Sequence, residues 1–462
     1  MISRLLKAAS VAALLSTSAF AADTDWNERF KEILGKSITF HTAEGHGQVP
    51  AYAAYLADQL KAGGFAAEDI HILPHGETAA LVVRYRGDGS AAKKPILLAA
   101  HMDVVEAKRE DWERDPFTMV EENGYLFGRG IVDNKFGVTL LVTTFLRLKA
   151  EGYVPNRDLV IAFSGDEESS MVTTKAIAND HRDLTDAEFV LNADAGGGTI
   201  GEDGKVLSYS LQAAEKTYAT FHLTVTDPGG HSSRPTGSNA IYRLAKALTA
   251  IENYSFPVNT NDITLGFFKA QGPLTGGELG AAMTAFAKDP SDKKAVATLR
   301  KQASYVGVTG TTCVATMLTG GHAENALPQS ATATVNCRIF PGEGVALTQE
   351  RLQKAVNDDR VVFTQRGEST ESPASPLRDD IMTAVTDAVH ANFPGLPIIP
   401  AMSPGATDGM HYRAAGMPTY GVEAIYMKNS DGFSHGLNER VPVATIPVAI
   451  DQMYRVLTTL TK

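Results

Sequence analysis

The feature of this sequence that most constrains its fold is a set of short apolar runs that end in histidine or acidic residues. In Leu97–Asp103, four aliphatic residues are followed at once by His-Met-Asp. An apolar run of this length is typical of a strand buried on both faces, as in a parallel sheet. Asp158–Phe163 and Glu188–Leu191 follow the same pattern, because Ser-Gly-Asp-Glu-Glu comes after the first and Asn-Ala-Asp after the second.

These polar ends predict a shared site. Ligands of open α/β sheets bind at the carboxyl ends of the strands. A further acid ends the turn Gly128–Asp133, directly before a predicted amphipathic helix over Phe136–Lys149. A single His-x-Asp triplet is weak evidence, because most such triplets lie in surface loops. The recurrence of the pattern in several segments favours one site that is built from several strand ends.

The length and charge of the chain limit its class. A chain of 462 residues is too long for one hydrophobic core and predicts two or three domains. The formal charge of −11 argues against nucleic acid as a partner, because nucleic-acid binding needs a basic surface. No run after the N-terminal segment approaches the ~18 apolar residues of a membrane-spanning helix, so no membrane span is expected.

The N-terminal segment has the pattern of a secretory signal peptide. Arg4 and Lys7 precede the apolar run Ala8–Leu15, and Ala19-Phe-Ala21 is a small-x-small cleavage site. We predict a signal peptide over residues 1–21, whose removal takes the formal charge from −11 to −13 because two basic residues are lost. No lipid-anchor cysteine follows, so the protein is predicted to be periplasmic or secreted.

Strand and helix patterns predict an α/β catalytic domain that is interrupted by a second domain. The catalytic domain would comprise residues 22–214 and 371–462, with a mostly parallel sheet covered by helices. Residues 215–370, called the lid domain below, show the β-α-β-β-α-β order of a ferredoxin-like unit. Its predicted elements are strands at 218–226, 312–318, 331–339 and 361–366, helices at 239–251 and 348–357, and a helical insert at about 276–301.

Cys313 and Cys337 are the only cysteines. They lie symmetrically about Asn325, so a hairpin-like pairing of their strands would place them opposite each other. A disulfide would suit an oxidising compartment, and two separately buried thiols are the alternative. The sequence leaves both open.

Short motifs appear in order along the whole chain. They are His101-Met-Asp103, Gly128-Arg-Gly-x-x-Asp133-x-Lys135, Asp166-Glu-Glu168, Asn192-Ala-Asp194, Gly229-Gly-His231-Ser-Ser, Asn325-Ala-Leu-Pro328, Arg338-x-x-Pro341-Gly342, Gly405-Ala-Thr-Asp408 and Ser434-His435-Gly436. Together they resemble the di-zinc metallo-exopeptidase family of glutamate carboxypeptidase, Gly-X carboxypeptidase, aminoacylase, succinyl-diaminopimelate desuccinylase and carnosine-type dipeptidase. The residues in these motifs are most similar to those of the Gly-X carboxypeptidase and aminoacylase branch.

The resemblance implies two zinc ions bound by five side chains. His101, Asp133 and Asp194 would bind one ion. Asp133, Glu168 and His435 would bind the other, so that Asp133 bridges the pair. Histidine nitrogen and carboxylate oxygen are normal zinc ligands, and a catalytic ion keeps a position open for water. Cobalt and manganese are alternatives, because availability as well as affinity decides which metal is bound. The resemblance also implies a cis peptide bond after Asp133.

The same resemblance implies the catalytic roles. Glu167 would be the general base that takes a proton from water and gives it to the leaving amine. Asp103 would orient the ring of His101 through its second N–H. His231 is similar to a histidine that reaches across a dimer to stabilise the oxyanion, which implies a homodimer formed through the lid domain.

The implied substrate is a small peptide or an N-acyl amino acid. Arg338 would clamp its free carboxylate, and Asn325 and Gly405 are further substrate-binding candidates. The implied reaction is hydrolysis of the adjacent amide bond by metal-bound hydroxide. Position 194 is aspartate, which is associated with dipeptidases, aminopeptidases and aminoacylases, so a deacylase or dipeptidase stays open beside a carboxypeptidase. An inactive binding protein on the same fold is a remote alternative, and a serine hydrolase is weaker still.

Overall fold

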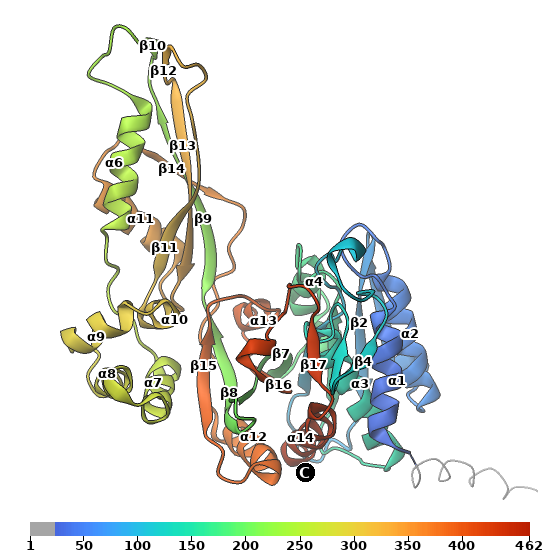
Figure 1. Cartoon of the computed structure of the whole chain (residues 1–462). Coiled ribbons are helices and arrows are strands. Elements are labelled where there is room, and N and C mark those ends of the chain that lie inside the picture. Colours follow the sequence, from blue (N-terminus) through green and yellow to red (C-terminus); the bar gives the residue numbers. More distant parts are fainter. Residues whose placement is uncertain (1–23) are drawn as a thin grey trace, which may run out of the picture.

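The computed structural model describes residues 24–462, and the predicted signal peptide lies outside the described residues. The largest sheet has eight strands in the order β1-β2-β6-β3-β7-β16-β8-β15 (Figure 1). Its central strands, β6 (Leu159–Ser164), β3 (Ile96–His101), β7 (Phe189–Ile200) and β16 (Thr419–Lys428), run parallel to one another. The predicted α/β class with a mostly parallel sheet is therefore confirmed.

One of the central strands, β7, is longer than the apolar run that predicted it. β7 continues to Ile200, so Asp194 lies inside this strand and not after it. Beyond the end of β3, β7 pairs with β16 and with β8 (Val206–Glu215), which extends it. The remaining strands of this sheet are β1 (Ile70–His75), β2 (Thr78–Tyr85) and β15 (Ile398–Ser403), and a small separate sheet joins β4 (Val120–Glu122), β5 (Tyr125–Phe127) and β17 (Arg440–Pro442).

Helices cover both faces of the large sheet. Neighbouring residues of β3 alternate between the two resulting cores, since Leu97 lies in one and Leu98 in the other. The larger core includes α1 (Trp26–Ile38), α2 (Val49–Ala62), α3 (Lys135–Ala150), α12 (Asp379–Asn392) and α14 (Thr445–Leu460), and the smaller one α4 (Val172–Asn179), α5 (Arg182–Thr185) and α13 (Gly409–Ala414).

The prediction that the helix over Phe136–Lys149 is amphipathic was wrong. This helix is α3, and nearly all of its residues are buried. α1 and α14 pack against it from outside, while β3 and β7 lie beneath it. A helix enclosed in this way has no solvent-facing stripe.

The lid domain contains a second, antiparallel sheet with the strand order β11-β13-β9-β14. Figure 1 shows that this sheet stands apart from the large one, with the short strands β10 (Gly230–His231) and β12 (Ala326–Leu327) at its far end. The chain order is β-α-β-β-α-β, formed by β9 (Thr217–Thr226), α6 (Ala240–Glu252), β11 (Thr312–Gly320), β13 (Ser330–Ile339), α11 (Val345–Val356) and β14 (Val362–Arg366).

The helical insert between α6 and β11 is longer than predicted. It starts at Asn261, which caps the first helix through a capping box with Thr264. The insert has its own apolar cluster around Phe268, Met283 and Phe286. Its helices are α7 (Asp262–Thr275), α8 (Gly277–Lys288), α9 (Lys293–Arg300) and α10 (Ala303–Val306).

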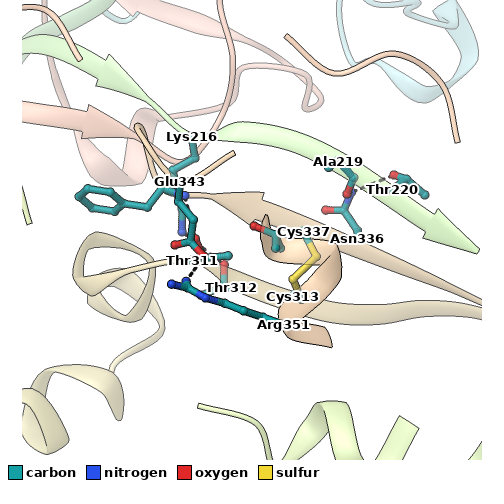
Figure 2. Close-up of a disulfide and its surroundings, with 12 residues drawn as sticks. Lys216, Ala219, Thr220, Thr311, Thr312, Cys313, Asn336, Cys337, Glu343 and Arg351 are labelled. Atoms are coloured by element: carbon teal, nitrogen blue, oxygen red, sulfur yellow. Dashed lines mark hydrogen bonds and ion pairs between the residues drawn. A yellow bond between two sulfur atoms is a disulfide. The ribbon is translucent and has the colours of Figure 1, made fainter. Parts of the chain in front are cut away.

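Cys313 and Cys337 form a disulfide between β11 and β13 (Figure 2). The two residues are register partners in the antiparallel pair, and their Cα atoms lie 4.0 Å apart. Of the two alternatives that the sequence left open, the structure therefore contains the disulfide. No helix within residues 24–462 is long and apolar enough to cross a membrane.

Candidate active site

The predicted site residues of the catalytic domain come together where the central parallel strands end. His101 is the last residue of β3, and Asp194 lies on β7 just beyond the pairing of that strand with β3. Three further segments reach the same place. They contribute Asp133 before α3, Glu167 and Glu168 after β6, and His435 in the loop between β16 and β17.

The ligand-type atoms form two groups that share Asp133. In the first group, Nε2 of His101 lies 2.9 Å from Oδ1 of Asp133 and 3.4 Å from Oδ1 of Asp194. In the second group, Nε2 of His435 lies 3.1 Å from Oδ2 of Asp133 and 2.9 Å from Oε1 of Glu168. Within each group, one ligand atom from every residue lies within 4.8 Å of the others. Asp133 thus offers one carboxylate oxygen to each group.

The electrostatics of these groups favour bound cations. Burial raises the pKa of Asp194 to about 6, and the charges of Asp133 and Glu168 add to this effect while His101 opposes it. Hydrogen bonds to Asp133 and Glu168 raise the pKa of His435 to about 10. Several carboxylates and two imidazoles packed this closely form the nitrogen and oxygen donor set that zinc, cobalt or manganese takes.

Asp103 lies beside His101 and also positions the two glutamates. Nδ1 of His101 lies 3.1 Å from the carbonyl oxygen of Asp103 and 3.4 Å from Oδ1, so the main-chain oxygen is the nearer acceptor. The carboxylate accepts hydrogen bonds from the backbone N–H of Glu167 at 3.0 Å and of Glu168 at 2.9 Å. The side chain of Asp103 therefore fixes the turn that carries both glutamates.

Glu167 lies beside the two groups. One of its carboxylate oxygens lies within 4.8 Å of ligand atoms of His101 and Glu168. Its carboxylate makes no hydrogen bond with any residue in the described part of the chain. Burial raises the pKa of Glu167 well above its usual range, and the charges of Asp194 and Asp408 add to this effect. A carboxyl group in this position, without a hydrogen-bond partner among the described residues, can accept a proton from a neighbouring group.

A buried carboxylate that the sequence analysis missed holds the backbone around Asp133. Glu439 is 0% exposed, and its Oε2 accepts hydrogen bonds from Nη1 of Arg129 at 2.7 Å and from the N–H of Gly130 at 3.0 Å. Its Oε1 accepts hydrogen bonds from the N–H of Val132 at 2.8 Å and from the N–H of Asp133 at 3.1 Å. The only sequence signal was an acid shortly after the His435 motif.

The peptide bond between Asp133 and Asn134 is cis, as the resemblance implied. The side chain of Asn134 donates a hydrogen bond to the carbonyl oxygen of Ala193 at 2.9 Å. This contact joins the Asp133 segment to β7 one residue before Asp194.

Two more carboxylates near the site were not singled out by the sequence analysis. Asp408 belongs to a predicted motif, and it accepts hydrogen bonds from the hydroxyls of Ser164, at 2.6 Å, and Thr174. Burial raises the pKa of Asp408 to about 7. Glu423 lies on β16 opposite Gly196, and burial together with the charges of Asp194 and Asp133 raises its pKa. A single acid inside a predicted apolar strand was the only signal for Glu423.

His231 and Asn325 lie together at the far end of the lid domain and away from the cluster (Figure 1). β10 pairs with β12 there, and the N–H of Ser232 donates to the carbonyl oxygen of Asn325 at 2.9 Å. The ring of His231 is exposed, and its Nδ1 accepts a hydrogen bond from the N–H of Ser233 at 3.1 Å. Within one chain, these two residues do not join the metal-ligand groups.

Arg338 and Gly405 lie where the lid domain meets the catalytic domain. Nη1 of Arg338 donates a hydrogen bond to the carbonyl oxygen of Pro404 at 3.2 Å, and its guanidinium group lies 4.7 Å from the ring of Tyr218. The loop that contains Gly405 leads directly to Asp408. Arg338 therefore contacts, from the lid domain, the loop that carries Gly405 and Asp408.

The segment Gly432-Phe-Ser434-His-Gly436 matches the letters of the serine-hydrolase pattern Gly-x-Ser-x-Gly. Its surroundings differ from a nucleophile elbow, which requires a sharp turn between a strand and a helix. Ser434 lies in a loop between a short 3-10 turn (Asn429–Asp431) and β17. A serine nucleophile is therefore not supported.

Most of this chain matches a known protein family. The model of peptidase family M20/M25/M40 matches residues 97–459. The N-fatty-acyl-amino acid synthase/hydrolase PM20D1 of Xenopus tropicalis is 28% identical over 366 residues, which are 77% of this chain and 70% of that protein. The probable carboxypeptidase S-like 2 of Dictyostelium discoideum is 27% identical over 391 residues, 82% of this chain and 73% of that one.

Among solved structures, the fold is similar to that of the M20 family metallo-carboxypeptidase Sso-CP2 from Sulfolobus solfataricus. The TM-score is 0.69 at 17% sequence identity, and the alignment covers 95% of this chain and 100% of the other. At this identity the likeness shows a shared fold.

Proposed function

This chain belongs to peptidase family M20/M25/M40, and we propose that it is a secreted, zinc-dependent exopeptidase or amidohydrolase. Family membership makes the chain a hydrolase of amide or peptide bonds. The proposed substrate is a small peptide or an N-acyl amino acid that is cleaved next to a free carboxylate. The observation that carries the proposal is the pair of ligand groups that share Asp133, with Glu167 unpartnered beside them.

The residues of the site divide the reaction between them. Two ions at these ligands would supply Lewis acids that polarise the scissile carbonyl and activate water. Glu167 takes the proton of the attacking water and returns it to the leaving amine. Asp103 keeps Glu167 and Glu168 in place through their backbone N–H groups. Arg338 binds the carboxylate of the substrate, because its planar guanidinium suits a bidentate contact.

The names of the relatives support the proposed substrate class. The relatives include proteins named N-fatty-acyl-amino acid synthase/hydrolase and probable carboxypeptidase. Both names describe bonds next to a free carboxylate, as does the proposed role of Arg338. N-acyl amino acids are therefore the first choice, with C-terminal peptide bonds and dipeptides as alternatives. An inactive binding protein is disfavoured, because each predicted ligand side chain is present in the cluster.

Hydrolysis assays on purified mature protein test this function. We expect cleavage of N-acyl amino acids or short peptides with a free C-terminal carboxylate, and loss of at least 10²-fold in rate after dialysis against a chelator. Added zinc, cobalt or manganese should restore the rate. The same substrates with an amidated C-terminus should react more slowly, because Arg338 then has no carboxylate to bind. A rate that the chelator does not change would contradict the proposal.

The proposed homodimer would form through the lid domain. Among residues 24–462, β11 pairs only with β13, and no strand pairs with its other edge. Val314, Met317 and Leu318 on this strand are 61%, 66% and 64% exposed. An exposed edge strand with large apolar side chains is a surface on which a second chain can pair. In such a dimer, His231 of one subunit would stabilise the oxyanion in the other.

Leu318→Glu is expected to convert the dimer to a monomer, because it places a charge in the apolar edge. Light scattering after size exclusion measures this change. Leu207→Glu is the matched control, because Leu207 is 48% exposed on the catalytic domain.

His231→Ala should keep the dimer and lower kcat about 10²-fold. Mixing His231→Ala with Glu167→Gln should restore part of the activity, because one site of each mixed dimer is intact. No recovery from mixed dimers would contradict a role across the interface.

A further inference from the structure

A third group of metal-ligand side chains lies outside the active site. It consists of His41 and His46, which lie in the loop between α1 and α2, and Glu106, which lies in the segment after β3. None of the three belongs to a motif of the active site, and neither ligand group of that site includes them.

Both histidines already contact the carboxylate of Glu106, and one ligand atom from each of the three residues lies within 4.8 Å of the others. Nε2 of His41 lies 2.8 Å from Oε1 of Glu106, and Nε2 of His46 lies 2.8 Å from Oε2 of the same carboxylate. Neighbouring ligand atoms of a tetrahedral zinc ion are roughly 3.3–3.5 Å apart, given bonds of about 2.0–2.2 Å. An ion could enter between these atoms if each nitrogen–oxygen distance of 2.8 Å widened by about 0.5–0.7 Å.

The surrounding structure holds the two histidine rings in this arrangement. Gly45 and Gly47 have φ values of +84° and +61°, which turn the loop back so that His46 stacks on His41 at 3.4 Å between ring centroids. Phe117 stacks on His41 at 3.8 Å. The N–H of His41 donates to Oε1 of Gln48 at 3.0 Å, which closes the loop.

The loop and the carboxylate are also joined to the end of β3. The hydroxyl of Thr42 donates to the carbonyl oxygen of Met102 at 2.9 Å, and the N–H of Ala107 donates to Oε1 of Glu106 at 2.8 Å. The side chains of His41, His46 and Glu106 are 22%, 36% and 49% exposed. A bound ion would thus have protein ligands on one side and water on the other.

We propose that His41, His46 and Glu106 bind a third divalent transition-metal ion, with zinc as the first choice. Two imidazole nitrogens and one carboxylate oxygen form a donor set typical of zinc, nickel or cobalt and less suited to calcium or magnesium. The ion would join the loop of residues 39–48 to the segment after β3, which contains Asp103. Its position outside the active site makes this a stabilising ion.

Glu106 is a carboxylate at neutral pH, and a metal ion would replace the Nε2 protons that the two histidines donate to it. Hydrogen bonds from His46, the Ala107 N–H and His41 outweigh desolvation and lower the pKa of Glu106 to about 2. Partial burial lowers the pKa of His41, although Glu106 opposes this effect. A carboxylate and a neutral imidazole are the forms that bind a cation.

Zinc content per chain tests the proposal directly. Wild type, His46→Gln and Glu106→Gln are equilibrated with buffered free zinc, and bound zinc is counted by mass spectrometry of the metal. His322→Gln is the control, because His322 is an exposed histidine of the lid domain outside every ligand group. We expect three ions in wild type and in the control, and one fewer in both cluster variants. Thermal unfolding should show stabilisation by this ion in wild type but not in His46→Gln.

The result is separable from the proposed function. If the active site binds no metal, wild type should still hold one ion more than His46→Gln. Hydrolytic activity of His46→Gln should stay within two-fold of wild type when the active site is loaded. Equal zinc content in wild type and both cluster variants would overturn the third site, whatever the active site binds.

Discussion

Glu167→Gln is expected to lower kcat by roughly 10²–10⁴-fold, which is the range that a positioned general base contributes. Glutamine keeps the shape of the side chain but cannot accept the proton of water. The carboxylate of Glu167 has no hydrogen-bond partner among the described residues, so this change should leave the fold and the metal content intact. Steady-state kinetics, together with metal content and thermal unfolding of the same sample, measure the effect.

Glu77→Gln is the matched control for this substitution, because Glu77 is an exposed glutamate that belongs to neither ligand group. It should keep the wild-type kcat. An active Glu167→Gln enzyme with both active-site ions bound would refute the assignment of Glu167 as the base. A loss of metal would instead make Glu167 a ligand.

Glu439→Ala is expected to reduce the free energy of unfolding by about 3–5 kcal/mol, the usual cost of removing one partner of a buried ion pair. Arg129 would keep a buried charge without its partner, and the N–H groups of Gly130, Val132 and Asp133 would lose their acceptor. Because these groups hold the backbone of the bridging ligand, metal affinity should fall as well. Denaturant unfolding and zinc titration measure the two effects.

Glu350→Ala provides a matched control, because Glu350 forms an exposed ion pair with Lys354 on α11. Surface pairs of this kind contribute about 0–1 kcal/mol. Glu439→Gln keeps the shape and part of the hydrogen bonding, so it should lie between wild type and Glu439→Ala. A loss below about 1 kcal/mol in Glu439→Ala would contradict the proposed support of the Asp133 segment by Glu439.

The sequence predicted those elements whose signal is local. α6 begins and ends within one residue of its predicted bounds, because Asn239 caps it and its apolar face repeats with the helical period. The apolar run before His101 predicted β3 for the same kind of reason. The helical insert was placed too late, because the capping box at Asn261 was not recognised.

Features that depend on distant partners could not be predicted in this way. β15 contains Pro400 and becomes a strand through its pairing with β8, which precedes it by almost two hundred residues. Glu439 acts on groups that lie 306–310 residues away in the chain. No local pattern distinguishes such a glutamate from one on the surface.

The sequence predicted those residues of the site that belong to recognisable motifs. The residues predicted as ligands lie together in the structure in the two expected groups, and their binding of metal remains a prediction. His231 and Asn325 lie at the far end of the lid domain, so their predicted roles depend on a second subunit. Arg338 lies at the junction of the two domains and contacts the loop of Gly405.

Anomalous X-ray diffraction at the zinc edge, from crystals of the zinc-loaded enzyme, tests the central claim most directly. At the active site we predict two peaks roughly 3.5–4 Å apart, one against His101 and Asp194 and the other against Glu168 and His435, with Asp133 between them. No peak at these residues, or a single ion that Asp133 does not contact, would contradict the account.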